Sequence, residues 1–384
     1  LDHPEENYPI IHVTGTNGKG SSIAFMSQLF AEHKKKVGTF TSPHMVSIYD
    51  RICVNHKPIS DKDFVRIGRR IQAMERQLLR TQDSLSYFEI LTLIALLYFE
   101  EEQVDVALIE VGIGGLLDTT NVVTGDIAVV TSVGLDHQET LGDSIAAIAE
   151  QKAGIFKEKK VAVIGPLTEE ARRVCELHAK KLDVVLYEYG RDFSFSKGQF
   201  FSPDVNIPHL KLSLAGTYQE ENAAVALQSF LLFMGQHSWQ VQIELVRKAL
   251  QETHWAGRLE YFERGIYLDG AHNLPALSRL VEFIRQQERK EIFLLFGALK
   301  RKNYQGMLSY LQQELPHVQL FVTTFEDDGA IDKQNLTTET YVSSYREFIE
   351  QFIKNSTDNQ LLFVTGSLYF IAEVRAFLLE KETD

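Results

Sequence analysis

A glycine-rich loop between an apolar strand and an amphipathic helix constrains this chain more than any other feature of its sequence. Residues 9–13 form a largely apolar run that predicts a short buried strand. Residues 23–30 carry apolar side chains at the spacing of one helix face. The glycines between them let backbone N–H groups converge on an anion, and the helix adds the positive end of its dipole. Strand, loop and helix in this order predict a phosphate-binding site; an ordinary turn that contains a lysine by chance is the alternative.

The loop differs in spacing from the common P-loop, G-x-x-x-x-G-K-[ST], in which a hydroxyl residue follows the lysine directly. Here Gly20 separates Lys19 from Ser21. Lys19 supplies a positive charge for a terminal phosphate, and Ser21 supplies a hydroxyl suited to Mg²⁺. The candidate nucleotide-binding residues of the loop are Thr16, Asn17, Gly18, Lys19, Gly20 and Ser21.

The composition excludes some classes of protein. Lysine and arginine number 39 and aspartate and glutamate 52, so the net charge of −13 argues against a nonspecific nucleic-acid binder. The two cysteines fit a reducing compartment and form no metal-binding pattern. We recognise no signal peptide, and the longest apolar stretch, residues 90–99, is too short to span a bilayer. We expect a cytoplasmic protein that acts on small molecules, without nucleic acid or membrane.

Strand and helix patterns alternate along most of the chain. Apolar runs predict strands at residues 37–41, 104–111, 126–133 and 160–165, with helical patterns among them. This alternation is typical of a mostly parallel sheet with helices on both faces. A smaller α/β pattern follows, with strands at residues 266–268, 292–296, 318–323 and 361–365. We predict an α/β protein with a mostly parallel P-loop ATPase domain at residues 1–255 and a smaller Rossmann-like domain at residues 256–384. Residues 193–209 show little helical period and predict a hairpin or loop.

Three polar side chains stand at the ends of predicted strands in the first domain. Ser42 and His137 follow strands, and Glu110 lies at the end of one. Because the carboxyl ends of parallel strands meet at one edge of a sheet, all three are placed beside the phosphate loop. A hydroxyl, a carboxylate and an imidazole could ligate Mg²⁺ there, although histidine is an unusual Mg²⁺ ligand. Taken singly, each has a structural alternative: a turn cap, a buried ion-pair partner and a hydrogen-bonded histidine.

Several motifs stand in a fixed order along the chain. They are G-T-N-G-K-G-S at residues 15–21, T-S-P-H at 41–44, E-V-G-I-G-G-L-L-D-T-T-N at 110–121, L-D-H at 135–137 and D-G-A-H-N at 269–273. With these motifs the chain resembles the Mur ligase superfamily, and more narrowly the folylpolyglutamate synthase/dihydrofolate synthase family. The resemblance implies that Ser42, Glu110 and His137 ligate Mg²⁺. Many bifunctional members of the family have arginine where this chain has Leu116.

The same resemblance implies roles for residues that other patterns would not single out. It implies that Lys152 is carbamylated and helps to hold a second Mg²⁺, whereas the residue alone is an ordinary helical lysine before a glycine C-cap. It implies that Asn222 meets the nucleotide base, although the polar first turn of a helix explains this residue equally well. In the second domain it implies that Arg258 and Asp269 contact ATP and that His272 lies near the incoming glutamate.

The resemblance also implies a reaction, in which ATP phosphorylates the γ-carboxylate of a folate and L-glutamate displaces the phosphate to form an amide. Dihydropteroate is a further substrate to be tested. The expected cofactors are ATP and two Mg²⁺ ions, a monomer is expected, and the candidate catalytic residues are Lys19, Lys152 and His272. The alternatives are another Mur-type amino-acid ligase, a P-loop kinase and a nucleotide-dependent switch. Phosphate release that requires glutamate separates the ligase from the kinase and the switch.

Overall fold

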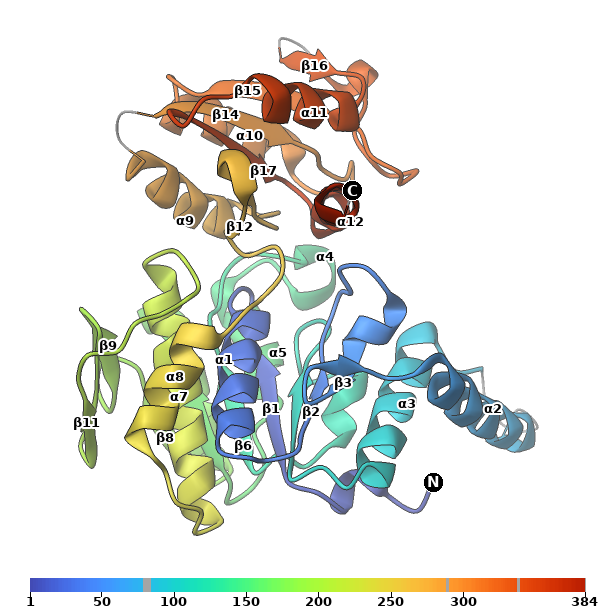
Figure 1. Cartoon of the computed structure of the whole chain (residues 1–384). Coiled ribbons are helices and arrows are strands. Elements are labelled where there is room, and N and C mark those ends of the chain that lie inside the picture. Colours follow the sequence, from blue (N-terminus) through green and yellow to red (C-terminus); the bar gives the residue numbers. More distant parts are fainter. Residues whose placement is uncertain (79–83, 288–289, 337–338, 384) are drawn as a thin grey trace. The chain divides into compact units, whose positions relative to one another are not determined.

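The computed structural model describes residues 1–78, 84–287, 290–336 and 339–383, which divide into two compact units (Figure 1). The first unit consists of Leu1–Ser213 and Gln219–His254, and the second of Leu214–Tyr218 and Trp255–Asp384. The short segment Leu214–Tyr218 groups with the second unit because Ala215 and Tyr218 pack against that unit's core. The chain therefore enters the second unit before residue 219 and again after residue 254.

An eight-stranded sheet with the strand order β4-β3-β2-β5-β1-β6-β7-β8 forms the centre of the first unit. All neighbouring strands from β2 to β8 in this order pair in parallel, whereas β3 pairs antiparallel with β2 and β4 antiparallel with β3. The central strands β1 and β5 are buried along their whole length, as expected for parallel strands covered on both faces. The predicted mostly parallel sheet is confirmed. The strands are β1 Ile10–Thr14, β2 Val37–Phe40, β3 Ile52–Val54, β4 Lys57–Pro58, β5 Val106–Glu110, β6 Ile127–Val130, β7 Val161–Ile164 and β8 Val185–Glu188.

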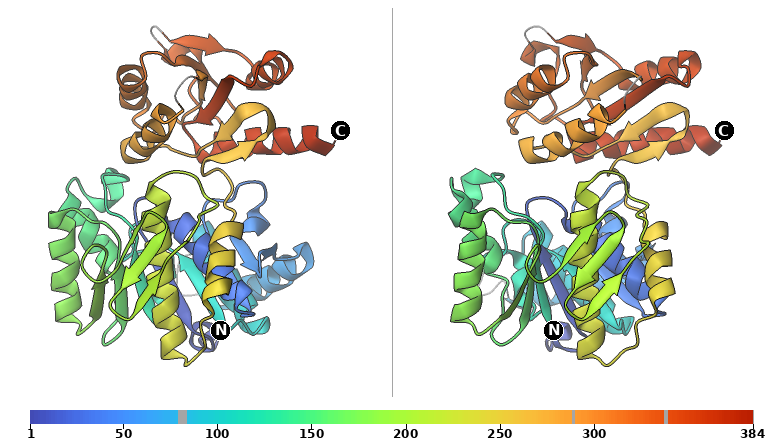
Figure 2. Two further views of the ribbon diagram at one scale, coloured as in Figure 1. Left: turned by 60° about the vertical axis from the view of Figure 1, so that its left-hand side comes forward. Right: turned by 90° about the vertical axis from the view of Figure 1, so that its left-hand side faces the viewer.

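Helices lie on both faces of this sheet, as Figure 2 shows. Helix α1 begins at Lys19, so the last three residues of the phosphate-loop motif, 19–21, form its first turn. Helix α3 is capped by Ser86 and Glu89 in a reciprocal capping box and contributes most of its residues to the core. The helices are α1 Lys19–Glu32, α2 Asp61–Leu78, α3 Tyr87–Glu101, α4 Gln138–Leu141, α5 Ile145–Ala153, α6 Glu169–Lys181, α7 Tyr218–Gln236 and α8 Ile243–Glu252, with short 3₁₀ turns at η1 Pro4–Glu6, η2 Ile48–Arg51 and η3 Thr119–Val122.

Residues 193–209, predicted as hairpin or loop, form a small antiparallel sheet in the order β11-β10-β9. The strands are β9 Ser194–Ser196, β10 Gln199–Ser202 and β11 Val205–Ile207. Lys197 and Gly198 both adopt positive φ, which is the conformation of a type I′ turn between two strands. Phe195 and Phe200 pair across the first two strands and are buried, so each strand places one aromatic ring in the interior.

The second unit contains a six-stranded sheet in the order β12-β13-β17-β14-β15-β16. Its strands pair in parallel except β12, which pairs antiparallel with β13. Phe296 on β14 and Phe363 on β17 are fully buried in its core. The elements are β12 Glu260–Phe262, η4 Glu263–Gly265, β13 Ile266–Leu268, α9 Leu274–Arg285, β14 Glu291–Phe296, α10 Tyr304–Glu314, β15 Gln319–Thr323, η5 Lys333–Asn335, β16 Thr340–Val342, α11 Tyr345–Asn355, β17 Gln360–Thr365 and α12 Leu368–Thr383. The predicted smaller α/β pattern is confirmed.

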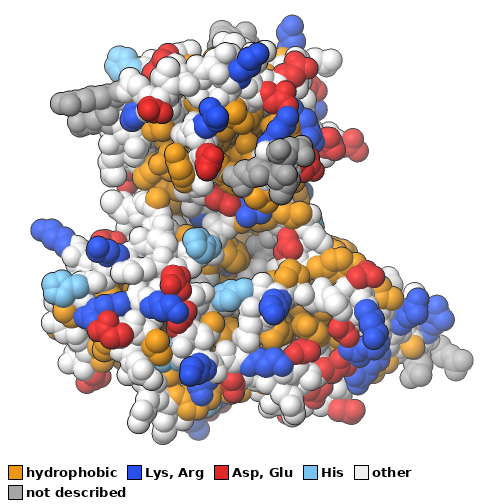
Figure 3. Space-filling model, viewed as in Figure 1, with side chains coloured by type: hydrophobic (Ala, Val, Ile, Leu, Met, Phe, Trp, Pro, Cys, Tyr) orange, Lys and Arg blue, Asp and Glu red, His pale blue; other side chains and the backbone are white. Residues whose placement is uncertain are grey.

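Positive and negative side chains are mixed on one face of the protein. On the face that Figure 3 shows, Lys and Arg side chains are interspersed with Asp and Glu. This mixture differs from the clustered positive charge on which nonspecific nucleic-acid binding depends. Within the described ranges, no helix combines the length and the apolar character that crossing a bilayer requires.

Candidate active site

The phosphate loop leaves β1 through two glycines that no other residue could replace without strain. Gly15 has φ +154° and Gly18 has φ +88°, and Gly18 precedes α1 in a left-handed conformation. A Cβ at Gly15 would lie 2.0 Å from Thr131 Oγ1, and one at Gly18 would lie 2.3 Å from Asn222 Oδ1. The loop therefore packs closely against the end of β6 on one side and the first turns of α7 on the other.

Side chains that follow β6 hold the loop in place. Thr131 Oγ1 donates to the carbonyl of Asn17 at 2.7 Å, and Ser132 Oγ accepts from Asn17 N–H at 2.9 Å. The hydroxyl of Thr16 donates to the Gly134 carbonyl at 3.1 Å and accepts from the Gly134 N–H at 2.9 Å. Sequence reasoning did not identify Thr131 or Ser132, which fall inside the strand predicted at residues 126–133, whereas β6 ends at Val130. The loop conformation is thus set by a segment more than 110 residues away in the chain.

Lys19, Glu110 and Ser42 come together at the carboxyl edge of the sheet. Lys19 Nζ donates to the Gly15 carbonyl at 2.9 Å and lies 3.8 Å from Glu110 Oε1. The other oxygen of Glu110 accepts from Ser42 N–H at 3.0 Å, and the Glu110 side chain is only 4% exposed. A buried carboxylate needs a nearby positive charge, and Lys19 supplies one here. A carboxylate and a hydroxyl at this edge are also the oxygen ligands that Mg²⁺ prefers, so these residues fit the predicted metal.

His137 lies on the loop between β6 and α4, as predicted. It directly precedes α4 with φ +49°, and its N–H donates to Asp136 Oδ1 at 2.9 Å. Its Nδ1 lies 3.7 Å from Glu139 Oε1, and its side chain is about one-third exposed. The ring is thus placed on the same edge of the sheet as the phosphate loop, since both follow neighbouring parallel strands.

Lys152 on α5 is the one buried lysine among the residues that the structure describes. Its side chain is 3% exposed, and burial lowers its pKa to about 7. The positive charge of Lys19 contributes to this lowering of the pKa, and Asp136 opposes it. An amine with this pKa is partly neutral at physiological pH and therefore nucleophilic, unlike an ordinary surface lysine.

In the second unit, the Asp269 side chain is hydrogen-bonded to the turn that contains Arg258. Its two oxygens accept from the backbone N–H groups of Leu259 and Ala271, each at 3.0 Å. Burial raises the pKa of Asp269, while Arg258 and the two backbone hydrogen bonds lower it. Gly270 allows the guanidinium to pass close to the backbone, because a Cβ there would lie 2.8 Å from Arg258 Nη1. Arg258 and Asp269 are thus brought together, as their shared predicted role requires.

His272 and Asn222 each have a defined orientation. His272 Nδ1 lies 2.8 Å from the Gly270 carbonyl, and because a carbonyl only accepts, Nδ1 carries the proton in this contact. The neutral ring then has its lone pair on Nε2. In the first unit, Asn222 Nδ2 donates to Gln219 Oε1 at 2.9 Å. Sequence reasoning selected Asn222 but assigned no role to Gln219, which stands three residues earlier in the same motif.

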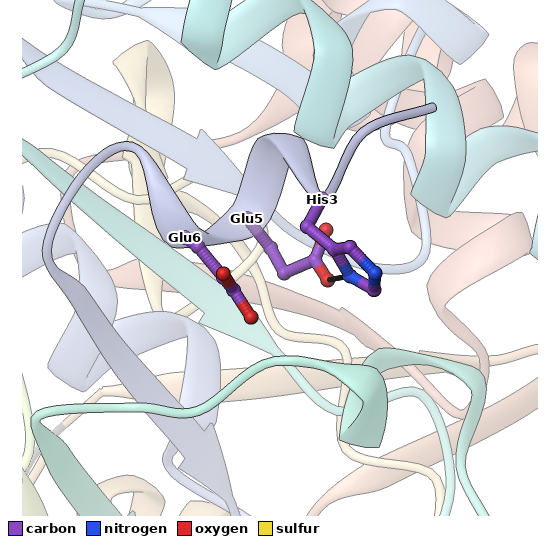
Figure 4. A group of neighbouring side chains, drawn as sticks. All are labelled: His3, Glu5 and Glu6. Carbon is purple, nitrogen blue, oxygen red and sulfur yellow. Dashed lines mark hydrogen bonds and ion pairs between the residues drawn. The ribbon is translucent and has the colours of Figure 1, made fainter.

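One group of possible metal ligands, in which His3 and Glu6 are exposed, lies away from these motifs. His3, Glu5 and Glu6 lie close together on and before η1 (Figure 4), and His3 Nδ1 is 3.1 Å from Glu5 Oε1. The proximity of Glu5 raises the pKa of His3. Exposed acidic side chains gather in this way without a metal, so the group is not assigned as a metal site.

Comparisons with known proteins agree on one family. A family model described as Mur ligase middle domain matches residues 13–230, and one described as Mur ligase, glutamate ligase domain matches residues 257–368. The dihydrofolate synthase/folylpolyglutamate synthase of Bacillus subtilis (strain 168) is 35% identical over 400 residues, which cover 98% of this chain and 91% of that protein. The folylpolyglutamate synthase of Lacticaseibacillus casei is 34% identical over 394 residues, which cover 99% and 92%. A solved FPGS-AMPPCP-folate complex has a TM-score of 0.87 and 33% sequence identity, with 98% of this chain and 92% of that chain covered.

These matches confirm the predicted family and the two-domain α/β fold, and they do not favour the kinase or the switch. The roles of the individual site residues stay predictions. The relatives are matched over nearly their whole length, and both halves of this chain carry a Mur ligase domain. The chain therefore belongs to the folylpolyglutamate synthase/dihydrofolate synthase family of ATP-dependent Mur ligases.

Proposed function

We propose that this chain joins L-glutamate to the γ-carboxylate of a folate at the expense of ATP. The observation that carries the proposal is the approach of the phosphate-loop lysine to a buried carboxylate, with Lys19 Nζ 3.8 Å from Glu110 Oε1. The substrates are supported by a relative named folylpolyglutamate synthase and by a similar solved complex with AMPPCP and folate.

Forming an amide from a carboxylate and an amine in water requires an activated acyl group. An oxygen of the γ-carboxylate attacks the γ-phosphorus of ATP, the bond to ADP breaks, and an acyl phosphate forms. The amine of glutamate then attacks the acyl carbon, the bond to the phosphate oxygen breaks, and the nitrogen loses a proton. The products are an amide, ADP and inorganic phosphate. Positioning and stabilisation of the transferring charge account for most of the catalysis in such a sequence.

In the first unit, the loop residues 16–21 would bind the phosphates of ATP, with Lys19 facing the terminal phosphate. Ser42, Glu110 and His137 would hold Mg²⁺, with water completing the coordination, and we propose two ions in all. Bound Mg²⁺ supplies charge neutralisation of the transferring phosphoryl group.

We further propose that Lys152 is carbamylated. The neutral amine attacks CO₂, a C–N bond forms, one proton is released, and the side chain becomes an anionic carbamate. Burial supports this proposal, because it keeps part of the amine neutral near pH 7. The nearby positive charge of Lys19 would then stabilise the carbamate, and the carbamate would help to hold the second Mg²⁺.

In the second unit, Arg258 and Asp269 would contact ATP. The guanidinium would bind a phosphate, and Asp269 would keep the turn at residues 257–259 in place through its backbone hydrogen bonds. Asn222, which belongs to the first unit, would meet the nucleotide base.

His272 carries its proton on Nδ1, so its Nε2 is able to accept a proton. We propose that Nε2 accepts the proton that the attacking amine loses.

The test is phosphate release from MgATP with a reduced folate, with and without L-glutamate. We expect release only when glutamate is present, together with a folate product one glutamate longer. Release that is indifferent to glutamate would contradict the proposal. A parallel reaction with dihydropteroate decides between one activity and two, because the two relatives carry different names at nearly equal identity.

Two variants test the carbamate. Lys152→Ala should lose phosphate release and recover part of it when a short carboxylate such as propionate is added, since the acid fills the vacated space. Lys152→Arg should not recover, because the arginine side chain fills that space. Equal recovery of both variants, or of neither, would count against a carbamate at this position.

We propose that the enzyme acts as a monomer in the cytoplasm on small-molecule substrates, without nucleic acid or membrane. The acidic net charge and the two unpaired cysteines support this setting. Light scattering after gel filtration at the concentration used for the assay should give one chain per particle. A dimer that persists at that concentration would contradict the monomer.

A further inference from the structure

Gln219 on the first turn of α7 is a buried polar side chain to which the proposed reaction assigns nothing. It is fully buried, and its carboxamide lies between two groups of the nucleotide site. Its Nε2 donates to Ser21 Oγ at 3.4 Å, and its Oε1 accepts from Asn222 Nδ2 at 2.9 Å. Burying a carboxamide is costly unless its ends are paired, so these two hydrogen bonds determine how the side chain is oriented.

The direction of the first hydrogen bond leaves the Ser21 hydroxyl suitably arranged for a ligand. A hydroxyl has one hydrogen and two lone pairs. Because Gln219 Nε2 donates, it uses one lone pair of Ser21 Oγ and leaves the other lone pair and the hydrogen for other partners. Those are the two features that a phosphate-loop hydroxyl needs, a lone pair for a metal ion and a hydrogen for a phosphate oxygen.

The second hydrogen bond determines which end of the Asn222 carboxamide faces the loop. Since Asn222 Nδ2 donates to Gln219, its Oδ1 points the other way and lies against Gly18, where a Cβ would be 2.3 Å from it. The backbone carbonyl of Asn222 also accepts from Ser22 Oγ at 3.4 Å. Gln219 thus links α7 to both the Gly18 and the Ser21 sides of the phosphate loop.

We propose that Gln219 is a positioning residue for the nucleotide site, which orients the Ser21 hydroxyl and the Asn222 carboxamide before MgATP binds. The inference rests on the proposed function only in that the loop binds MgATP. It concerns nucleotide binding and not the later attack by glutamate.

The first experiment compares two buried glutamines of the same helix. Gln219→Ala removes the linking carboxamide, and Gln228→Ala is the matched control. Gln228 is 5% exposed on α7, and its Oε1 has no hydrogen-bond partner among the described residues. We measure binding of MgAMPPCP to the full chain by calorimetry and the KM values for ATP and glutamate.

Gln219→Ala should weaken MgAMPPCP binding about tenfold and raise KM for ATP, with KM for glutamate unchanged. Gln228→Ala should stay within about twofold of the native chain.

A double-mutant cycle asks whether Gln219 acts through Ser21. If it does, the double variant of Ser21→Ala and Gln219→Ala should bind MgAMPPCP more tightly than the product of the two single losses predicts, and any remaining loss relative to Ser21→Ala is the contribution through Asn222. A loss equal to the product of the two single losses would overturn the proposal, because independent contributions multiply in the dissociation constant.

Gln219→Glu keeps the shape of the side chain and the acceptor for Asn222 but removes the donor to Ser21. We expect it to weaken MgAMPPCP binding at least as much as Gln219→Ala. Native-like binding by Gln219→Glu would overturn the proposal, because the donor would then be dispensable. Thermal unfolding without nucleotide identifies any variant that has lost its fold. If the native chain itself did not bind MgAMPPCP, the proposed function would fail first, so the two failures are distinguishable.

Discussion

Acid should destabilise the first unit through His12, a histidine in the middle of β1. Its ring is completely buried, and Nε2 lies 2.9 Å from Thr120 Oγ1. The Thr120 hydroxyl donates to Asp118 Oδ1 at 2.6 Å, so the hydrogen of the first contact has to come from His12 Nε2. Nδ1 then carries the lone pair, and it has no hydrogen-bond partner among the described residues. A proton added to Nδ1 would therefore create an uncompensated buried charge.

Burial and the positive charge of Lys157 lower the pKa of His12 to about 3. The pKa of His12 in the folded chain is then below its value of about 6.5 in the unfolded chain. Between these two pKa values the unfolded chain binds a proton at this histidine and the folded chain does not. Stability is present in full above pH 6.5 and is lost as the pH falls below it. At pH 5, the pH lies about 1.5 units below the pKa of about 6.5 that the histidine has in the unfolded chain. The free energy of unfolding is then about 2 kcal/mol lower than at neutral pH. The loss approaches about 5 kcal/mol near pH 3, where the folded group begins to titrate as well.

The test is urea unfolding of the full chain at pH 7 and pH 5, for the native protein and for His12→Gln. Glutamine can replace the donor to Thr120 but does not titrate, and all other titrating groups are common to both proteins. The native chain should lose about 2 kcal/mol more than His12→Gln between the two pH values. His317→Gln, a change at an exposed histidine, is the control and should behave as the native chain does. If His12→Gln loses as much stability as the native chain, His12 accepts its proton in the folded state and the reasoning from burial is wrong.

Four further predictions concern the phosphate loop and the metal. Lys19→Met should lower glutamate-dependent phosphate release at least about 100-fold, since it removes the charge that we propose to face the terminal phosphate, and a near-native rate would contradict this role. Gly18→Ala should lower the free energy of unfolding by about 1–3 kcal/mol and weaken MgADP binding, because φ is +88° and the new Cβ would meet Asn222. An unchanged melting temperature would contradict this prediction. Chelation with EDTA should abolish phosphate release and excess Mg²⁺ should restore it. Glu110→Gln should raise the Mg²⁺ concentration for half-maximal activity about tenfold, whereas an unchanged requirement would exclude Glu110 as a ligand.

The phosphate loop and the parallel sheet could be predicted because their signals are local. The loop lies between a strand and a helix that adjoin it in the sequence, and glycine is needed where φ is positive, as at Gly18. The central strands β1 and β5 are buried over their whole length and are mostly apolar because both faces are covered, so they stand out in the sequence. Local patterns of this kind need no knowledge of which strands become neighbours.

The residues that were missed depend on contacts between distant parts of the chain. Ser132 meets Asn17 from 115 residues away, and Gln219 meets Ser21 from 198 residues away. Threonine, serine and glutamine are common polar residues, so nothing at their own positions marks these contacts. The strands β9–β11 were not resolved into three because each has only three or four residues, too few for a clear alternation of buried and exposed side chains.

Strand order explains why motifs far apart in the sequence form one site. Strand β1 lies between β5 and β6, with Val13 opposite Glu110 and Thr14 opposite Val130. The loop that leaves β1 therefore has Glu110 on one side and the segment after Val130, which leads to His137, on the other. Strand β2 lies beyond β5 and brings Ser42 next to Glu110. The sequence order loop, Ser42, Glu110, His137 thus becomes the spatial order Ser42, Glu110, loop, His137. A shift of one residue between β1 and β5 would carry Glu110 to the opposite face of the sheet relative to Lys19, so the register of these two strands is as much a requirement of the site as the residues themselves.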